Sequence, residues 1–427
     1  MATQQVSHIS EDATGASDGS LFSRLRRWPD LEAPELFAAD AADRLLVSEA
    51  QEFLTGEVSV VVIGDSYGAL TLGLVESGAG TATPVRVHQD GRAGELALDN
   101  NAENVAIGRM TFRHLPLDVE LVAQAKLVVM RLPKALDQLD EWSALIAANA
   151  APEVVVLAGG RDKYMTASMT GILEKYFGQV TVGRGTQKSR VITARVPRPD
   201  QAAEALSRLP QCQHNADFDV DICAFGGVFA SSSLDIGTRA LLDVLDRVPG
   251  QQNQHIIDFG CGTGVLAVQL ARLRPTAQVI ATDQSAAAVR SANATVRANN
   301  VADRVRVVQD DGLSSQADNS ADLIVFNPPF HSGAAVHADT SMRLFAEAGR
   351  VLKPGGELWV VANRHLSYRA ALRRLVGSTR LISQTPKFTV TASTKDGGVA
   401  DAQRRVTRTR KAPRGLPNES TRNNFAN

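Results

Sequence analysis

The chain has 427 residues, which is enough for two or three ordinary domains. Its contents of 44% hydrophobic and 21% charged residues are typical of soluble globular proteins, and no apolar stretch of about 18 residues predicts a membrane span. The formal net charge of −1 excludes a global basic excess, so any nucleic-acid binding must depend on local patches.

Residues 1–20 are polar and acidic and contain no apolar core of a secretory signal. We expect them to be disordered in a cytoplasmic protein that has no membrane partner. The three cysteines, Cys212, Cys223 and Cys261, have spacings that fit neither a zinc site nor a disulfide framework. We therefore expect reduced thiols and no bound metal.

The first half of the chain alternates apolar runs of strand length with helical stretches. Such alternation predicts a mostly parallel α/β sheet. Residues 196–200 contain two prolines and residues 211–218 are polar, so both segments are predicted to form a linker without regular structure. An amphipathic helix is predicted over 40–54, and strands over 58–63, 85–88, 126–130, 154–157 and 191–194.

The same alternation begins again after the linker, and the two halves align at one offset. Gly68 falls on Gly264 and Arg131 falls on Asn327, in both cases 196 positions apart (264 − 68 and 327 − 131). Two landmarks at one offset indicate a duplicated α/β domain. Strands are predicted over 255–258, 278–282, 305–308, 323–326, 357–362 and 387–391, and helices over 265–273 and 341–352.

A glycine-rich turn follows the first predicted strand of the second half. Asp258 precedes Gly260, Gly262 and Gly264, and glycines let the backbone turn tightly beside a ligand at a helix N-terminus. The spacing is Gly-x-Gly-x-Gly, which differs from the Gly-x-Gly-x-x-Gly of dinucleotide sites. Together with the preceding acid it resembles motif I of the Rossmann-like methyltransferases, which implies S-adenosylmethionine as the cofactor.

Two acidic residues at the next strand ends complete the predicted cofactor site. Asp283 can accept hydrogen bonds from both ribose hydroxyls of a nucleoside cofactor, although it can also cap the following helix. Asp311 ends the third strand, where the methyltransferase pattern places an acid beside the adenine amino group. Asp310 is an alternative for this role.

The fourth strand ends in Asn327-Pro328-Pro329-Phe330. Two prolines cannot continue a sheet ladder and fix a rigid, extended turn. The side-chain oxygen of Asn327 and the carbonyl of Pro328 can each accept one N–H of an exocyclic amino group, which points its lone pair at the methyl donor. Phe330 can stack on a planar substrate, and His331 either contacts the substrate or caps the next helix.

Three groups of residues, 327–331, 227–237 and 361–366, resemble the bacterial ribosomal RNA guanine-N2 methyltransferases. The resemblance covers 21–393 and implies two tandem Rossmann-like methyltransferase domains, of which only the second binds cofactor. Residues 363–368 and 387–388 are most similar to the branch that acts on large-subunit (23S) RNA, and the related 16S branch shares the motif after the fourth strand.

The first half lacks the chemistry of the second. Arg131 stands where the second half has Asn327, and a guanidinium cannot accept hydrogen bonds from an amino group. Val62 replaces Asp258 at the aligned position. We therefore predict that this domain is degenerate and positions RNA, with Arg131 as a substrate contact. The other candidates for a basic face are Arg86, Arg92, Lys126 and Lys134.

The sequence thus predicts a disordered segment 1–20, a degenerate domain 21–200, a catalytic domain 201–394 and a disordered basic tail 395–427. The expected reaction is methylation of a guanine N2 in 23S rRNA, either protein-free or in an assembly intermediate, because the base must be unpaired or flipped. Alternatives are a 16S rRNA enzyme, a protein-glutamine methyltransferase, an adenine-N6 DNA methyltransferase and a non-enzymatic RNA-binding assembly factor.

Overall fold

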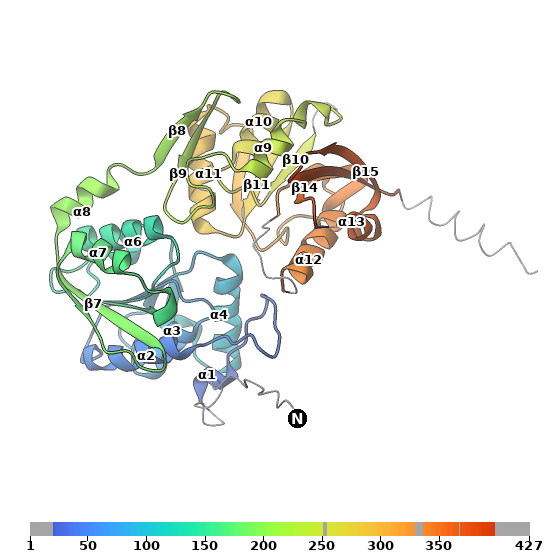
Figure 1. Ribbon diagram of the computed structural model, residues 1–427. Helices are drawn as coiled ribbons and strands as arrows, with labels where there is room; N and C mark the ends of the chain where they lie inside the picture. The colour runs from blue at the N-terminus through green and yellow to red at the C-terminus, as the bar shows by residue number, and fades with distance from the viewer. Residues whose placement is uncertain (1–19, 251–253, 329–335, 367, 398–427) are drawn as a thin grey trace, which may run out of the picture.

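The computed structural model describes residues 20–250, 254–328, 336–366 and 368–397. These form two α/β domains that follow one another along the chain (Figure 1). Each contains a seven-stranded sheet, with the orders β3-β2-β1-β4-β5-β7-β6 and β12-β11-β10-β13-β14-β16-β15, which are the same order by position. The prediction of two tandem Rossmann-like domains is confirmed. The terminal segments predicted to be disordered lie almost entirely outside the described residues.

The first domain contains the first seven strands, of which β1 to β5 pair in parallel and β7 runs antiparallel to both of its neighbours, β5 and β6. Its strands are β1 Val60–Ile63, β2 Val85–His88, β3 Phe112–His114, β4 Leu127–Arg131, β5 Val155–Arg161, β6 Phe177–Val182 and β7 Ser189–Pro197. Its helices are α1 Leu21–Arg24, α2 Ala41–Ala50, α3 Ala69–Glu76, α4 Arg92–Asn104, α5 Val119–Val122, α6 Leu136–Asn149, α7 Ala167–Tyr176 and α8 Pro199–Leu206.

The second domain repeats this plan after a two-stranded hairpin. The hairpin strands are β8 Gln211–Asn215 and β9 Val220–Ala224. The sheet strands are β10 His255–Phe259, β11 Gln278–Asp283, β12 Val305–Gln309, β13 Ala321–Phe326, β14 Leu352–Asn363, β15 Gly377–Gln384 and β16 Phe388–Lys395. The helices are α9 Ile236–Leu242, α10 Val265–Leu273, α11 Ala286–Ala298, α12 Val336–Val351 and α13 Arg369–Leu375.

The central strands are mostly apolar, with Asp258 of β10 as an exception, because helices cover both faces of each sheet. Along β1, Val60 and Val62 pack into one buried cluster, whereas Val61 and Ile63 pack into another. A strand that is buried on both faces needs a continuous apolar run rather than an alternating pattern. This explains why the β-branched runs in the sequence predict these strands well.

The strand register confirms the duplication. Val62 of β1 pairs with Val129 of β4, and Asp258 of β10 pairs with Val325 of β13. Each residue of the second pair lies 196 positions after its counterpart in the first (258 − 62 and 325 − 129). The offset found in the sequence is therefore also an offset between equivalent positions in the two sheets.

The prediction of an unstructured linker is wrong. Strand β7 continues to Pro197, and α8 begins at Pro199, where a proline costs little because the first N–H of a helix has no partner within the helix. Residues 211–224 form the β8–β9 hairpin, which packs on α11. The polar residues that suggested a loop lie on β8, which is mostly exposed to solvent.

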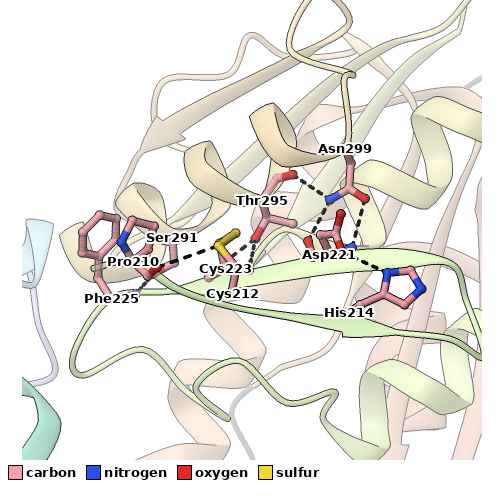
Figure 2. The surroundings of a disulfide bond; sticks show 9 residues. All are labelled: Pro210, Cys212, His214, Asp221, Cys223, Phe225, Ser291, Thr295 and Asn299. Atoms are coloured by element: carbon pink, nitrogen blue, oxygen red, sulfur yellow. Dashed lines mark hydrogen bonds and ion pairs between the residues drawn. A yellow bond between two sulfur atoms is a disulfide. The ribbon is translucent and has the colours of Figure 1, made fainter. Parts of the chain in front are cut away.

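The prediction of reduced cysteines with no disulfide is also wrong for two of the three residues. The antiparallel register of the hairpin places Cys212 directly opposite Cys223, and the two form a disulfide. Figure 2 shows this disulfide beside α11, where the Thr295 hydroxyl accepts a hydrogen bond from the backbone N–H of Cys223. Cys261 is a free, buried thiol. The pairing could not be found from spacing because the hairpin itself was not predicted.

The two domains contact each other through equivalent loops. The sheet registers make Val87 equivalent to Ala281, so Asp90 in the loop after β2 corresponds to Gln284 in the loop after β11. The Arg92 N–H donates to the Gln284 carbonyl at 2.9 Å, and the Ala286 N–H donates to the Asp90 carbonyl at 2.7 Å. Each loop therefore donates one backbone N–H to a backbone carbonyl of the other loop.

A buried ion pair adds a second link between the domains. Glu141 of α6 pairs with Arg290 of α11 at 2.7 Å and accepts the Gly226 N–H at 2.8 Å. The Arg290 guanidinium also lies 3.9 Å from the centroid of the Phe225 ring. In the described part of the chain, no helix is both long and apolar enough to cross a membrane.

Candidate functional site

A cavity of about 520 Å³ lies at the carboxyl ends of the central strands of the second sheet. Its wall includes the turn 260–263, Asp283, Asp311 and Asn327. Neighbouring strands β10 and β13 lead to opposite halves of the sheet, and open α/β sheets bind ligands where the strand order reverses. The sequence-predicted strand ends are thus brought together in one cavity.

The glycine turn has the left-handed backbone that its sequence indicates. Gly262 has a φ of 53° and Gly264 a φ of 80°, values that residues with a side chain rarely adopt. A Cβ atom on Gly264 would also lie 3.0 Å from the Cβ of Ala292 on α11. The turn can therefore pass close to α11 and open α10 only with glycine at this position.

Asp258 lies beneath the glycine turn rather than in the cavity wall. Its Oδ2 accepts the Ala267 N–H of α10 at 2.9 Å, and among the described residues its buried Oδ1 has no hydrogen-bond partner. Burial raises the pKa of this carboxyl to about 7, and the nearby charge of Asp283 acts in the same direction. An unpartnered buried carboxylate oxygen is unfavourable unless a donor satisfies it.

Asp283 lines the cavity at the end of β11 and is not the helix cap. Its Oδ2 accepts the Gly262 N–H at 2.9 Å, and its Oδ1 accepts the Ser285 N–H at 3.0 Å. The cap of α11 is Ser285, whose hydroxyl accepts the Ala288 N–H at 3.1 Å. Burial raises the pKa of Asp283, although the two backbone N–H groups oppose this. Asp283 therefore orients the glycine turn from within the cavity.

Asp310 and Asp311 have different surroundings, although both line the cavity. The carboxylate of Asp310 accepts hydrogen bonds from the hydroxyls of Ser314 and Ser315 and from the Ser315 N–H, so it holds the turn after β12. Asp311 receives two hydrogen bonds from Arg343 of α12, at 2.9 and 3.2 Å. Arg343 was not predicted, because only the fold brings α12 to this strand end.

Asn327 is held by two residues that the sequence did not assign to it. Its Nδ2 donates to Asp235 Oδ2 at 2.9 Å and to the Thr238 hydroxyl at 3.0 Å. Because an amide nitrogen can only donate, these two acceptors fix the orientation of the side chain, and no described residue donates a hydrogen bond to its Oδ1. A Cβ on Gly237 would lie 2.9 Å from this Oδ1, so the glycine leaves space there.

Asp235 is also the N-cap of α9, since its carboxylate accepts the Thr238 N–H at 3.0 Å. From the segments 227–229 and 234–237, which carry part of the family resemblance, the structure places Phe229, Leu234 and Asp235 in the cavity wall. Pro328 lines the cavity as well. The predicted substrate contacts Phe330 and His331 lie outside the described residues, as does Pro329.

Both halves of the chain match known protein families. Residues 219–392 match the Methyltransferase small domain family, and residues 16–198 match the RLMG N-terminal domain family. The chain is 34% identical over 381 residues to the ribosomal RNA large subunit methyltransferase G of Streptomyces coelicolor, covering 87% of this chain and 98% of that protein. The chain belongs to the ribosomal RNA large subunit methyltransferase G family.

A relative of the same family name from Pseudomonas aeruginosa is 33% identical over 370 residues, which cover 86% of this chain and 96% of that protein. Among solved structures, a Thermus thermophilus 16S rRNA N2 G1207 methyltransferase in complex with AdoMet and guanosine shares the fold. It has a TM-score of 0.65 at 20% identity and covers 88% of this chain and 99% of that one. This likeness supports the two-domain arrangement.

The N-terminal domain of this family member has lost the equivalent site. Gln89 stands at the position of Asp283 and donates to the Asp65 carbonyl at 2.6 Å. At the position of Asn327, Arg131 pairs with Asp40 at 2.7 Å and Asp43 at 2.8 Å. The charged carboxylate is thus replaced by a neutral amide and the amide oxygen of Asn327 by a guanidinium that can only donate, in agreement with a degenerate domain.

The Arg131 cluster is a structural ion-pair network. Burial alone would raise the pKa of Asp40, but the hydrogen bond and the charge of Arg131 lower it to about 2. Asp43 is more deeply buried, and desolvation raises its pKa to about 7 despite the same arginine. The guanidinium of Arg131 is engaged by carboxylates of its own domain, so we do not include Arg131 in the proposed substrate site.

Two other members of the predicted basic face also have partners within the first domain. Arg86 donates to the Ala123 carbonyl at 2.7 Å and to the Ser59 hydroxyl at 2.7 Å. Arg92 pairs with Glu95 at 2.5 Å. The remaining two candidates, Lys126 and Lys134, are exposed to solvent.

Proposed function

We propose that this chain transfers a methyl group from S-adenosylmethionine to the exocyclic N2 of a guanine in 23S ribosomal RNA. The observation that carries the proposal is the fixed amide of Asn327, whose nitrogen is bound by Asp235 and Thr238. Its oxygen is therefore presented to the cavity as an acceptor for an amino group. Membership of a family named for large-subunit rRNA methylation supports the choice of substrate.

The residues around the cavity fit the proposed cofactor. S-adenosylmethionine supplies an electrophilic methyl group on a sulfonium. Asp283 would accept hydrogen bonds from the ribose hydroxyls, and Asp311 would face the adenine amino group. The glycine turn 260–264 gives the backbone a close approach, and the unpartnered Oδ1 of Asp258 can accept from a donor at the amino-acid end.

The proposed chemistry needs acceptors rather than a strong base. The guanine amino nitrogen has a lone pair that is conjugated into the ring, so it is a poor nucleophile. Asn327 Oδ1 and the Pro328 carbonyl would each accept one of its N–H groups and favour a tetrahedral nitrogen. Phe330 would stack on the base, and His331 would contact the substrate.

We further infer the organisation of the protein from this function. Residues 21–200 form the degenerate domain and 201–394 the catalytic one, flanked by the segments 1–20 and 395–427. The acceptor would be protein-free RNA or an assembly intermediate in the cytoplasm, because the guanine must leave its stack to reach Asn327.

The direct test is methyl transfer from labelled cofactor to protein-free 23S and 16S RNA, followed by nucleoside analysis. The proposal requires N2-methylguanosine in 23S RNA. Label in 16S RNA would reassign the subunit. Label in adenine or in a protein glutamine would overturn the proposal, and so would RNA binding without any methyl transfer.

A further inference from the structure

A long stretch of the second domain is basic without any acidic residue. Between Glu357 and Asp396 the chain contains seven lysines and arginines and no aspartate or glutamate. The whole chain, in contrast, has 45 basic and 46 acidic residues. This stretch therefore carries a net positive charge although the chain as a whole is nearly neutral, and it includes the end of β14, α13, β15 and β16.

Two of the seven cations are used within the fold. Arg380 donates to the carboxylate of Glu357 at 2.7 and 3.0 Å, and Lys395 donates to the carbonyl of Leu352 at 2.7 Å. The other five are exposed, and no described carboxylate lies within ion-pair distance of any of them. We call these five residues the basic rim: Arg364, Arg369, Arg373, Arg374 and Lys387.

One end of the basic rim borders the cavity directly. Asn363 and Phe388 form the last register pair of β14 and β16, and both line the cavity. Arg364 follows Asn363, and Lys387 precedes Phe388. The Arg364 N–H donates to the Lys387 carbonyl at 2.8 Å, so these two residues lie side by side where β14 ends and β16 begins.

The rest of the basic rim lies on α13, close to the same mouth. Leu372 is buried, and the three arginines occupy the solvent-exposed side of this short helix. Tyr368, the residue before α13, packs edge-on against Phe345 of α12, with ring centroids 5.2 Å apart. Helix α13 lies beside α12 (Figure 1), and α12 supplies Arg343 and Leu344 to the cavity wall.

We propose that the basic rim binds the phosphate backbone of the RNA substrate while one base enters the cavity. This inference rests on the proposed function and specifies where the polynucleotide lies. Arginine guanidinium groups match phosphate oxygens with two parallel hydrogen bonds. Within the described residues none of the five cations forms an ion pair with a carboxylate, so their charges are available to displace the counterions of the RNA.

The first domain is less suited to be the main contact with the RNA phosphate backbone. Of the basic face predicted from the sequence, Arg86, Arg92 and Arg131 already bind acceptors of their own domain. Only Lys126 and Lys134 of that set remain exposed, and they are far from the basic rim in sequence. If the basic rim binds the RNA, its removal should weaken binding. If Lys126 and Lys134 bind the RNA, only their removal should do so.

The test compares RNA affinity across three full-length variants. The first is Arg369→Ala/Arg373→Ala/Arg374→Ala, the second is Arg364→Ala/Lys387→Ala, and the control is Lys126→Ala/Lys134→Ala. The dissociation constant of a fluorescein-labelled oligouridine RNA is measured by anisotropy over a range of salt concentrations. Thermal unfolding and S-adenosylmethionine affinity of each variant show that the fold and the cofactor site are intact.

We expect the triple variant to bind RNA roughly ten-fold more weakly, because three phosphate contacts are removed. The magnitude of its slope of log K against log salt concentration should fall by about two. In the double variant this magnitude should fall by about one, and the control should match the wild type in both affinity and slope. Wild-type affinity and slope in both rim variants would overturn the proposal, and so would an effect confined to the control.

Failure of the proposed function and failure of the basic-rim proposal give different results. If the rim variants bind RNA weakly but the wild type does not methylate guanine, the proposed methylation of 23S RNA is rejected and the RNA-binding role of the basic rim is retained. If both rim variants methylate guanine in 23S RNA with the wild-type KM, the proposed function is retained and the role of the basic rim is rejected.

Discussion

Asp90 of the first domain accepts the N–H of Ala287 in the second domain at a distance of 2.8 Å. This hydrogen bond satisfies one of the free N–H groups at the start of α11, only four residues after the cavity residue Asp283. The Asp90 carbonyl also accepts the Nε2 of Gln309 at 3.1 Å. Ala93 and Asp30 of the first domain line the cavity as well. The first domain therefore contributes residues to the cavity of the second domain, although its own equivalent positions lack the site residues.

Replacing Asp90 by alanine should weaken S-adenosylmethionine binding about five-fold, because a lost acceptor at a helix N-terminus costs about 1 kcal/mol and α11 directly follows the loop of Asp283, which we propose to bind the ribose. Asp90→Asn should retain most of the affinity, since an amide oxygen can still accept the Ala287 N–H. Isothermal titration calorimetry measures both. Asp118→Ala is the matched control, because Asp118 caps α5 in the first domain. Equal losses of affinity in Asp90→Ala and Asp118→Ala would contradict this role.

The hydroxyl of Thr238 should matter for turnover more than for cofactor binding. Thr238→Val keeps the shape of the side chain but removes one of the two acceptors of the Asn327 amide nitrogen. We expect kcat for RNA methylation to fall roughly ten-fold with an unchanged Kd for the cofactor, because the acceptor oxygen is less well oriented. Thr238→Ser, which retains the hydroxyl, should behave as the wild type. A purely structural role would instead lower the unfolding temperature of Thr238→Val without a selective loss of kcat.

Removal of the Asn327 side chain should have a larger effect. Asn327→Ala loses one of the two acceptors proposed for the guanine amino group, so kcat should fall by about a hundred-fold. Asp235, Thr238 and the glycine turn stay in place, and cofactor affinity should therefore change little. Single-turnover methylation of 23S RNA and calorimetric titration of the cofactor separate the two quantities. Near-normal turnover in this variant would refute the proposed role of the amide oxygen.

Asp258 should make the protein less stable as the pH rises. Burial raises the pKa of this carboxyl from 3.8 to about 7 in the folded state. The folded state therefore binds more protons than the unfolded state, so the stabilisation is complete below about pH 4 and is lost as the pH rises through about 7. Asp258→Asn cannot ionise and should be up to about 4 kcal/mol more stable than the wild type at pH 8.

Urea unfolding of the wild type and of Asp258→Asn at several pH values measures this difference. The free energies of unfolding of the two proteins should converge near the acidic end of the range. The gain in stability should come with weaker cofactor binding, because the carboxylate oxygen without a partner is replaced. A difference in stability that does not depend on pH would contradict the raised pKa.

The two equivalent glycines offer a comparison within one chain. Gly264 and Gly68 both have left-handed backbones, with φ values of 80° and 92°, and a Cβ on either would collide with a neighbouring helix. Gly264→Ala and Gly68→Ala should each destabilise the fold by about 1–3 kcal/mol. Only Gly264→Ala should also reduce cofactor affinity, since only the second domain has the site. Equal effects on calorimetric affinity would indicate that the first domain binds cofactor too.

The sequence predicted the parts of the fold that depend on local pattern. Strand β1 is a β-branched run buried on both faces, and Asp283 and Asn327 stand at the ends of the apolar runs of β11 and β13. Strand positions therefore located the site residues. Short or partly exposed strands, such as β3 at Phe112–His114 and β15 at Gly377–Gln384, have no such run and were not predicted.

Contacts between distant segments could not be predicted in the same way. Asp235 meets Asn327 across 92 positions, and Arg343 meets Asp311 across 32. Nothing in either segment alone indicates its partner. The sequence also suggested that Arg131 is free to contact substrate, whereas it binds two carboxylates that lie about 90 residues earlier.

The reciprocal contact between the loops at Asp90 and Gln284 has the form of an isologous interface, in which each member gives its partner what it receives. Two identical subunits make such a contact across a twofold axis. The two loops of this single chain are therefore related as a twofold axis relates the two sides of a homodimer contact. A single chain can nevertheless carry different residues on the two sides, and here Asp90 stands opposite Gln284. The loop at Asp90 can thus be specialised to support the second domain, through Ala286, Ala287 and Gln309.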